Sequence, residues 1–155
     1  TAGALPSNFK RELTILGSSV RTIQALSRLP WNRWQKDMKR ILVVDDNTEY
    51  LQVLSNVLSN DFDTIKATGV KDALDILQAI TVDAICSDFN MKDGTGLDLL
   101  EDIRQQGITA PFLLMSGDDD CLLEQKTKLY GGVFCSKTDY DLIGKIKSLI
   151  NTETA

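Results

Sequence analysis

The stretch Ile41-Leu42-Val43-Val44-Asp45-Asp46 decides the fold, because it joins a short apolar run to an acidic end. Apolar runs of about four to eight residues that are rich in β-branched side chains are typical of strands buried on both faces of a parallel sheet. Apolar residues then recur at helical spacing over residues 51–58, and Asn47 or Thr48 can cap that helix. The segment predicts a strand, a polar turn and a helix in succession.

The same unit recurs to the end of the chain. Further strand-like runs cover residues 64–67, 84–87, 112–115 and 133–136, and helical patterns cover residues 70–77, 97–103, 119–129 and 142–149. Gly107 is placed to end the third helix and Asp139 to cap the last one. Five strands that alternate with five helices predict a doubly wound α/β domain, with a parallel sheet covered on both faces.

Composition excludes several classes of protein. A chain of 155 residues allows one domain with a short appendage, since a domain takes about 150 residues. No apolar run approaches the roughly 18 residues that span a bilayer. The sequence contains no histidine, which excludes His-based catalysis and His-containing zinc sites. The three cysteines lack CxxC spacing, and we interpret Cys86 and Cys135 as buried, reduced thiols of a cytoplasmic protein.

The charge is unevenly distributed. Residues 1–40 carry eight Lys/Arg and two Asp/Glu, a balance of +6, whereas residues 41–155 carry nine and twenty, a balance of −11. This split predicts a basic N-terminal extension or linker at 1–40 and a separate domain at 41–155. The acidic domain is poorly suited to nucleic acid, so we expect no nucleic-acid partner.

The N-terminal extension predicts an amphipathic helix. Apolar residues recur from Phe9 to Ile23 at alternating spacings of four and three, and Trp31 and Trp34 follow among basic residues. Three interpretations stay open. The helix packs on the domain or on a second copy, it docks on a partner protein or an anionic membrane, or it is the end of a larger protein from which this piece was cut.

Polar residues follow the predicted strands at the point where each one ends. They are Asp45 and Asp46, Asp88, Ser116 and Lys137. Each alone is most simply a solvated loop residue, but the carboxyl ends of strands in an open α/β sheet meet at one edge, where sites form. Three clustered carboxylates repel one another without a cation, and oxygen ligands suit Mg²⁺. With a lysine and a hydroxyl beside them, they predict phosphoryl transfer to Asp88.

These residues resemble the receiver domains of two-component response regulators. The resemblance is carried by Val43-Val44-Asp45-Asp46, by Asp88-Phe89-Asn90-Met91 with Gly94 and Gly96, by Met115-Ser116-Gly117 and by Lys137. It covers residues 41–150 and implies a flavodoxin-like fold with strand order 2-1-3-4-5.

The resemblance also implies a role for each site residue. Asp88 is the expected phosphoacceptor, supplied by a histidine kinase or a phosphotransfer protein. The expected Mg²⁺ ligands are Asp45, Asp46, Asp88 and the backbone carbonyl of Asn90. Ser116, Lys137 and the aromatic Phe134 are expected to bind the phosphoryl group or to switch with it, and Asn90 and Asp118 to tune its lifetime.

Two positions depart from the family pattern. Thr138 follows the lysine where proline is usual, often with a cis bond, and Lys92 stands where proline is common four residues after the acceptor. A cis bond before a residue other than proline costs about 2.5–4 kcal/mol, so we expect a trans peptide here and a lysine that is held differently.

We expect a phosphorylation-dependent switch that is not an enzyme beyond its own phosphorylation and dephosphorylation. Its output is expected to be contact with an unknown downstream protein, since residues 151–155 are too short for a DNA-binding module. Homodimers through the N-terminal helix, or through the face of helix four, strand five and helix five, stay open. The alternative is a receiver-like scaffold that works without phosphorylation. An aspartate phosphatase is disfavoured, because Asp45-Asp46-Asn47 is not a DxD motif.

Overall fold

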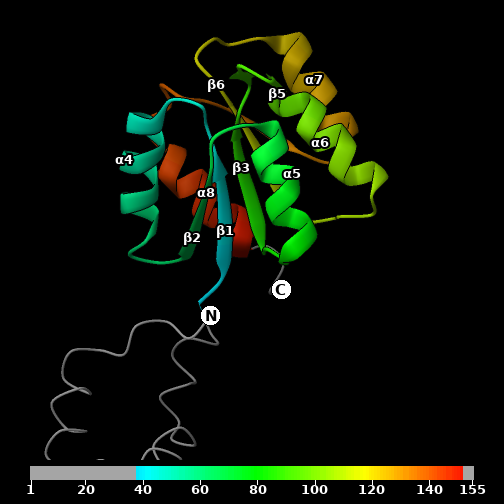
Figure 1. Ribbon diagram of the computed structural model, residues 1–155. Helices are drawn as coiled ribbons and strands as arrows, with labels where there is room; N and C mark the ends of the chain where they lie inside the picture. Colours follow the sequence, from blue (N-terminus) through cyan, green and yellow to red (C-terminus); the bar gives the residue numbers. More distant parts are fainter. Residues whose placement is uncertain (1–37, 152–155) are drawn as a thin grey trace, which may run out of the picture. The chain divides into compact units, whose positions relative to one another are not determined.

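The computed structural model describes residues 38–151, and the predicted N-terminal amphipathic helix lies outside them. The described chain alternates strands and helices (Figure 1). Its strands are β1 (Arg40–Val44), β2 (Asp63–Ala67), β3 (Ala84–Asp88), β4 (Asn90–Met91), β5 (Gly94–Thr95), β6 (Phe112–Ser116) and β7 (Val133–Ser136). Its helices are α4 (Thr48–Leu58), α5 (Val70–Ala79), α6 (Gly96–Gln105), α7 (Cys121–Leu129) and α8 (Leu142–Asn151).

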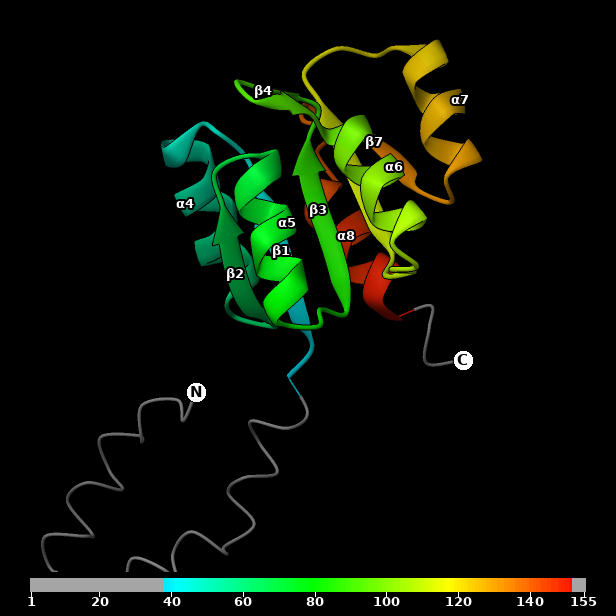
Figure 2. The same ribbon diagram turned by 45° about the vertical axis from the view of Figure 1, so that its right-hand side comes forward.

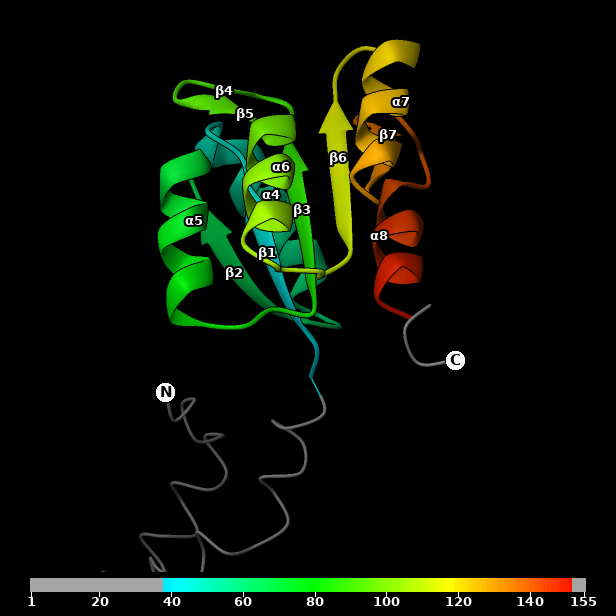
Figure 3. The ribbon, with the colours of Figure 1, turned by 90° about the vertical axis from the view of Figure 1, so that its right-hand side faces the viewer.

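Five parallel strands form the main sheet, in the order β2-β1-β3-β6-β7. Counted along the chain, these are strands 2-1-3-4-5, so the predicted flavodoxin-like order is confirmed. Successive residues of β1 point to opposite faces of the sheet, as a strand requires. Ile41 and Val43 enter the core beneath α4 and α8, whereas Leu42 and Val44 enter the core beneath α5, α6 and α7 (Figures 1 and 3).

The helix ends follow local chemistry. Asn47 caps α4, because its Oδ1 accepts the N–H groups of Glu49 and Tyr50, both at 3.2 Å. Gly107 follows the end of α6 with a φ of 81°, a left-handed conformation that glycine adopts without a Cβ clash. The last helix, α8, begins at Leu142, three residues after the predicted cap Asp139. The Asp139 carboxylate accepts the N–H of Asp141 at 2.8 Å, and its carbonyl accepts that of Leu142 at 3.2 Å.

The prediction of buried, unpaired thiols agrees with the structure, and the fourth helix of the domain, α7, packs weakly. Cys86 and Cys135 are buried, and all three cysteines are free. On α7 only Leu123 and Thr127 are buried, and Leu129 is 81% exposed. Within residues 38–151, no helix combines the length and apolar character needed to cross a bilayer.

The strands β4 and β5 form a small antiparallel hairpin that the sequence patterns did not predict. It lies beyond the carboxyl end of β3 (Figure 2). Its turn residue Asp93 accepts the N–H of Val70 at 2.9 Å and that of Lys71 at 3.0 Å, so it caps the first turn of α5 from a distant part of the chain. These backbone hydrogen bonds hold the pKa of Asp93 below its ordinary value.

Replacing this distant cap should destabilise the domain. We expect Asp93→Ala to lower the free energy of unfolding by about 1 kcal/mol at pH 7, a typical cost of losing a helix cap. Because the folded pKa of Asp93 is lowered, its contribution is full above the unfolded value of about 3.9 and is lost as the pH falls through the folded value. Urea denaturation at pH 7 and near pH 3 should therefore show the difference between wild type and variant shrinking in acid.

Asp75→Ala is the matched control, because Asp75 lies on the same helix and makes an exposed ion pair with Lys71, at 3.2 Å. Such a pair contributes about 0.3–0.5 kcal/mol. Equal effects of the two substitutions at pH 7 would show that Asp93 is not a cap.

Candidate functional site

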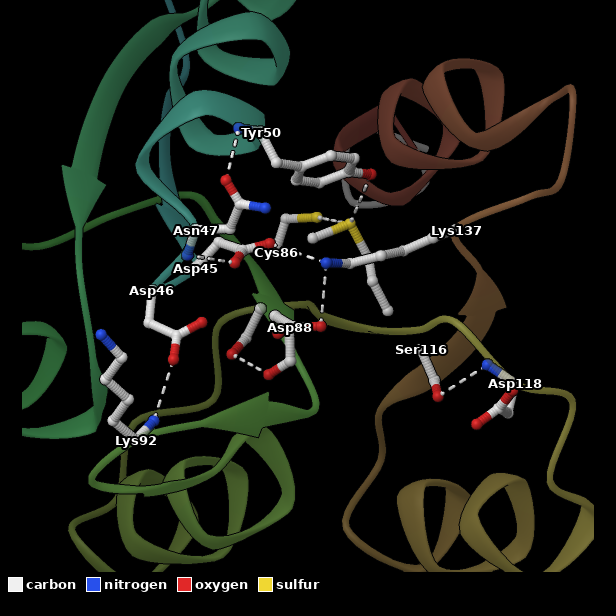
Figure 4. Close-up of polar contacts among 12 residues, drawn as sticks. Asp45, Asp46, Asn47, Tyr50, Cys86, Asp88, Lys92, Ser116, Asp118 and Lys137 are labelled. Carbon is white, nitrogen blue, oxygen red and sulfur yellow. Dashed lines mark hydrogen bonds and ion pairs between the residues drawn. The ribbon is translucent and has the colours of Figure 1, made fainter.

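Three aspartates converge at the carboxyl ends of β1 and β3 (Figure 4). Asp45 and Asp46 follow β1 directly, and Asp88 is the last residue of β3. One carboxylate oxygen from each lies within 4.8 Å of the others. Asp45 is fully buried and Asp88 is 8% exposed, so the cluster sits at the base of the rim and not on open surface.

Lys137 bridges two of these carboxylates from the end of β7. Its Nζ donates to Asp45 Oδ2 at 2.8 Å and lies 3.0 Å from Asp88 Oδ1. Burial raises the pKa of Asp88 above its ordinary value, and the Asp45 charge adds to this, although the hydrogen bond from Lys137 opposes both. Burial alone would lower the pKa of Lys137, but its hydrogen bonds to Asp45 and Asp88 raise it, so the ammonium stays charged.

The backbone around Asp88 is fixed by a close approach of helix α6. Gly96, the first residue of α6, donates its N–H to Phe89 O at 2.8 Å. A Cβ at Gly96 would lie 2.3 Å from Asp88 O and 2.5 Å from Leu114 Cδ1, so no other residue fits without moving the strand end. Gly96 therefore keeps the backbone of Asp88 in place.

The hairpin closes one side of the site. Asn90, exposed, begins β4 two residues after Asp88. Lys92 donates its N–H to Asp46 Oδ2 at 3.0 Å. Proline has no N–H, so the departure from the family pattern at Lys92 supplies a backbone donor to a carboxylate of the cluster.

Ser116 and Asp118 lie together on the other side of the site. Ser116 ends β6, is 6% exposed and accepts the N–H of Asp118 on its Oγ at 3.2 Å. Among the described residues, no hydrogen bond joins Ser116 to Asp88, and Figure 4 shows the hydroxyl beside Asp118. Phe134 on β7 is half-buried and packs against the core beneath α5, α6 and α7.

The peptide between Lys137 and Thr138 is trans, as expected, since the described residues contain no cis bond. Thr138 replaces the usual proline with hydrogen bonds to Ser136. Its N–H reaches Ser136 Oγ at 3.3 Å, and the two hydroxyls lie 2.8 Å apart. The N–H of Lys137 donates to Ser116 O at 2.7 Å.

Sequence reasoning missed one residue of the site, Tyr50. The ammonium of Lys137 lies 4.2 Å from the centroid of the Tyr50 ring. The Tyr50 hydroxyl lies 3.9 Å from Met115 Sδ, which also receives a contact from Cys86 Sγ at 3.4 Å. An aromatic residue in the first turn of a helix gives no sequence signal of its own, because the contact depends on the fold.

The fold and this rim define a doubly wound α/β domain with a buried acidic site and one bridging lysine at its strand ends. The chain belongs to the response regulator receiver domain family, whose sequence model matches residues 41–133. Receiver domains are parts of two-component signal transduction systems. The predicted family and fold are therefore confirmed.

Curated relatives agree with the family. The chain is 28% identical over 117 residues to the response regulator protein PilR of Pseudomonas aeruginosa, covering 74% of this chain and 26% of that protein. It is 36% identical over 87 residues to the regulator of RpoS of Escherichia coli, covering 53% and 25%. It is 30% identical over 138 residues to the sensor histidine kinase RcsC of Salmonella typhimurium, covering 79% and 15%. The chain spans about a quarter or less of the length of these relatives.

Solved structures show the same fold. The receiver domain of the Francisella response regulator 1452 superposes with a TM-score of 0.69 at 24% identity, covering 74% of this chain and 98% of that one. The response regulator TrrA of Thermotoga maritima, solved in complex with Mg²⁺-BeF, superposes with a TM-score of 0.63 at 25% identity, covering 72% and 99%. A receiver protein from Pseudomonas putida gives 0.65 at 27% identity, covering 74% and 97%.

Proposed function

We propose that this domain is a phosphorylation-dependent switch, in which Asp88 accepts a phosphoryl group from the phosphohistidine of a histidine kinase or a phosphotransfer protein. The observation that carries the proposal is the position of Asp88. Its carboxylate lies close to those of Asp45 and Asp46, and the ammonium of Lys137 pairs with it at 3.0 Å. This arrangement supplies a nucleophile, oxygen ligands for a cation and a fixed positive charge at one point.

The proposed transfer is a single displacement at phosphorus. One carboxylate oxygen of Asp88 forms a bond to phosphorus while the P–N bond of the phosphohistidine breaks. The electron pair of that bond stays on the imidazole nitrogen, and a proton carried by the other ring nitrogen makes the leaving imidazole neutral. Lys137 then pairs with a phosphoryl oxygen and stabilises the charge that builds up during transfer.

The acidic cluster fits Mg²⁺. Oxygen atoms of Asp45, Asp46 and Asp88 lie within 4.8 Å of one another, and these hard ligands match the preference of that ion. These carboxylates, with the carbonyl of Asn90, would hold it. When bound, Mg²⁺ neutralises charge on the transferring phosphoryl oxygens.

The same proposal gives roles to the surrounding residues. Ser116, whose hydroxyl now accepts the Asp118 N–H, would turn its O–H toward a phosphoryl oxygen on Asp88. Phe134 is half-buried and would turn further inward as Ser116 moves. Helix α7 buries few residues, so it is the element most easily displaced by that change. Asn90 and Asp118 flank the acceptor region and would tune how fast the acyl phosphate is hydrolysed.

Incubation with acetyl phosphate tests the function. With Mg²⁺, intact-mass analysis should show one added phosphoryl group, and with EDTA it should show none. A sample that stays unlabelled should be offered a phosphorylated histidine kinase as donor. If that also fails, the scaffold alternative holds, and this proposal is wrong.

Loss of one cluster carboxylate should weaken Mg²⁺ binding. We expect Asp46→Asn to raise the Kd for Mg²⁺ by about tenfold or more, measured by isothermal titration calorimetry, because even residues behind a metal ligand contribute that much. Asp119→Asn removes the same charge from an exposed loop residue and should leave the Kd nearly unchanged. Equal Kd values for wild type and Asp46→Asn would place the ion elsewhere.

A further inference from the structure

The ammonium of Lys137 has a third neighbour beside its two carboxylates. The Tyr50 ring lies with its centroid 4.2 Å from Nζ. Tyr50 stands in the first turn of α4, directly after the acidic pair, so the helix brings the ring over the site (Figure 4).

The partial burial of both side chains should strengthen this cation–π contact. A cation over an aromatic face is attracted by the ring quadrupole, and the attraction grows as the pair loses water. The Lys137 side chain is only 21% exposed, and Tyr50 is half-buried. The near neighbours of the ammonium include the Asp45 and Asp88 oxygens and the ring.

The ring is held independently of the lysine. Asn47 Oδ1 accepts the N–H of Tyr50 at 3.2 Å, which fixes the start of the helix. The N–H of Asn47 in turn donates to Asp45 Oδ1 at 2.9 Å. The Tyr50 hydroxyl also lies against Met115 Sδ. The acidic cluster, the helix cap and the ring thus form one connected unit that faces Lys137.

The lysine itself is less constrained by its own backbone. A lysine ammonium is a point charge at the end of a flexible four-carbon stem. The residue after it is Thr138 in a trans peptide, so no proline ring restricts the chain there. Contacts made by the side chain itself, with Asp45, Asp88 and the Tyr50 ring, therefore help to set its direction.

We propose that Tyr50 is a positioning residue that holds the Lys137 ammonium beside Asp88. The inference rests on the proposed function, because the position matters for a phosphoryl group carried by Asp88. A cation–π contact depends on the charge and uses no particular N–H group. Lys137 can therefore exchange a carboxylate partner for a phosphoryl oxygen without leaving the ring.

Nuclear magnetic resonance tests the contact without any ligand. The methylene protons next to Nζ of Lys137 should be shifted upfield by the ring current in wild type and in Tyr50→Phe, which keeps the ring. The shift should disappear in Tyr50→Leu, which keeps an apolar side chain on the helix. An unchanged lysine resonance in Tyr50→Leu would overturn the proposal.

Binding of beryllofluoride at saturating Mg²⁺ tests whether Tyr50 helps Lys137 to bind a phosphoryl group on Asp88. Beryllofluoride is a stable mimic of a phosphoryl group on a carboxylate. We expect Tyr50→Leu to raise its Kd about three- to tenfold, a cation–π contribution, and Tyr50→Phe to change it less than about twofold. In a Lys137→Ala background, Tyr50→Leu should have no further effect, as a residue acting through Lys137 requires.

Two outcomes of this comparison of single and double variants would contradict the inference. An equal loss from Tyr50→Leu with and without Lys137 would show that Tyr50 acts on the site by another route. A Tyr50→Phe protein as weak as Tyr50→Leu would assign the effect to the hydroxyl. If wild type failed to bind beryllofluoride at all, the proposed function would fall, and the lysine resonances would still decide the Tyr50 contact.

Discussion

Asp88→Asn should take up no phosphoryl group under conditions that label the wild-type protein completely. The substitution keeps the shape of the side chain but replaces a carboxylate oxygen by an amide, which is not a nucleophile at neutral pH. The neighbour Asp45 is not expected to take its place, because it is fully buried and a phosphoryl donor cannot approach it. Intact-mass analysis after incubation with acetyl phosphate and Mg²⁺ measures the effect.

The loss of labelling should not come from unfolding. Burial raises the pKa of Asp88 in the folded protein, so the ionised carboxylate costs stability once the pH exceeds its unfolded value of about 3.9. Asp88→Asn removes this cost and should be at least as stable as wild type at pH 7. Asp119→Asn, at an exposed position, should label normally. Labelling of Asp88→Asn to the wild-type extent would move the acceptor to another residue.

Lys137→Ala should still bind Mg²⁺ but should lose the response to phosphorylation. The three carboxylates remain, whereas the charge that we propose to pair with the phosphoryl oxygens is gone. A hydrogen bond to a charged group contributes about 1.5–3 kcal/mol, so we expect beryllofluoride binding with Mg²⁺ to weaken by one to two powers of ten. Nuclear magnetic resonance spectra should then lack the shifts that phosphorylation causes in wild type.

The same substitution should also destabilise the metal-free domain. It leaves Asp45, whose side chain is 1% exposed, and Asp88 without their cation. Breaking a fully buried pair costs about 3–5 kcal/mol, and the partial exposure of Lys137 puts our expectation near the lower end. Added Mg²⁺ should restore more stability to Lys137→Ala than to wild type.

Lys147→Ala is the control for this effect. Lys147 pairs with Asp61 at 3.0 Å with both side chains exposed, a contact that contributes about 0.2–1 kcal/mol. Urea denaturation with and without Mg²⁺ compares the three proteins. A Lys137→Ala domain as stable as Lys147→Ala, with a normal spectral response to phosphorylation, would contradict the role given to this lysine.

The architecture was predictable because each strand carries its own signal. The run at residues 41–44 is apolar on both faces, as a central strand requires, and it indeed lies between β2 and β3. The positions of Asp45, Asp88 and Lys137 followed from the rule that parallel strands end at one edge. A sequence pattern could therefore place these groups together before any distance was known.

The features that could not be predicted from the sequence depend on contacts between segments that are distant in the chain. The hairpin β4–β5 has two-residue strands, too short for periodicity to detect. Asp93 caps α5 across 23 residues from Val70, and the Tyr50 ring meets a lysine that lies far along the chain. None of these residues differs in type from an ordinary surface residue, so only the fold assigns them a role.

The two departures from the family pattern have different consequences in the structure. At Lys92, the replacement of proline adds a backbone N–H that donates to Asp46. At Thr138, it leaves a trans peptide with local hydroxyl contacts to Ser136. The acidic cluster and Lys137 come together despite both changes, with Tyr50 as an additional contact of the lysine.

The measurement that tests the central claim most directly is the position of the phosphoryl group in the labelled chain. Borohydride reduces an aspartyl phosphate to homoserine, and peptide mass spectrometry then locates the altered residue. After incubation with acetyl phosphate and Mg²⁺, we predict homoserine at position 88 and unchanged aspartate at positions 45, 46 and 118. Homoserine at any other position, or none in a protein that has gained phosphoryl mass, would contradict the assignment of Asp88 as the acceptor.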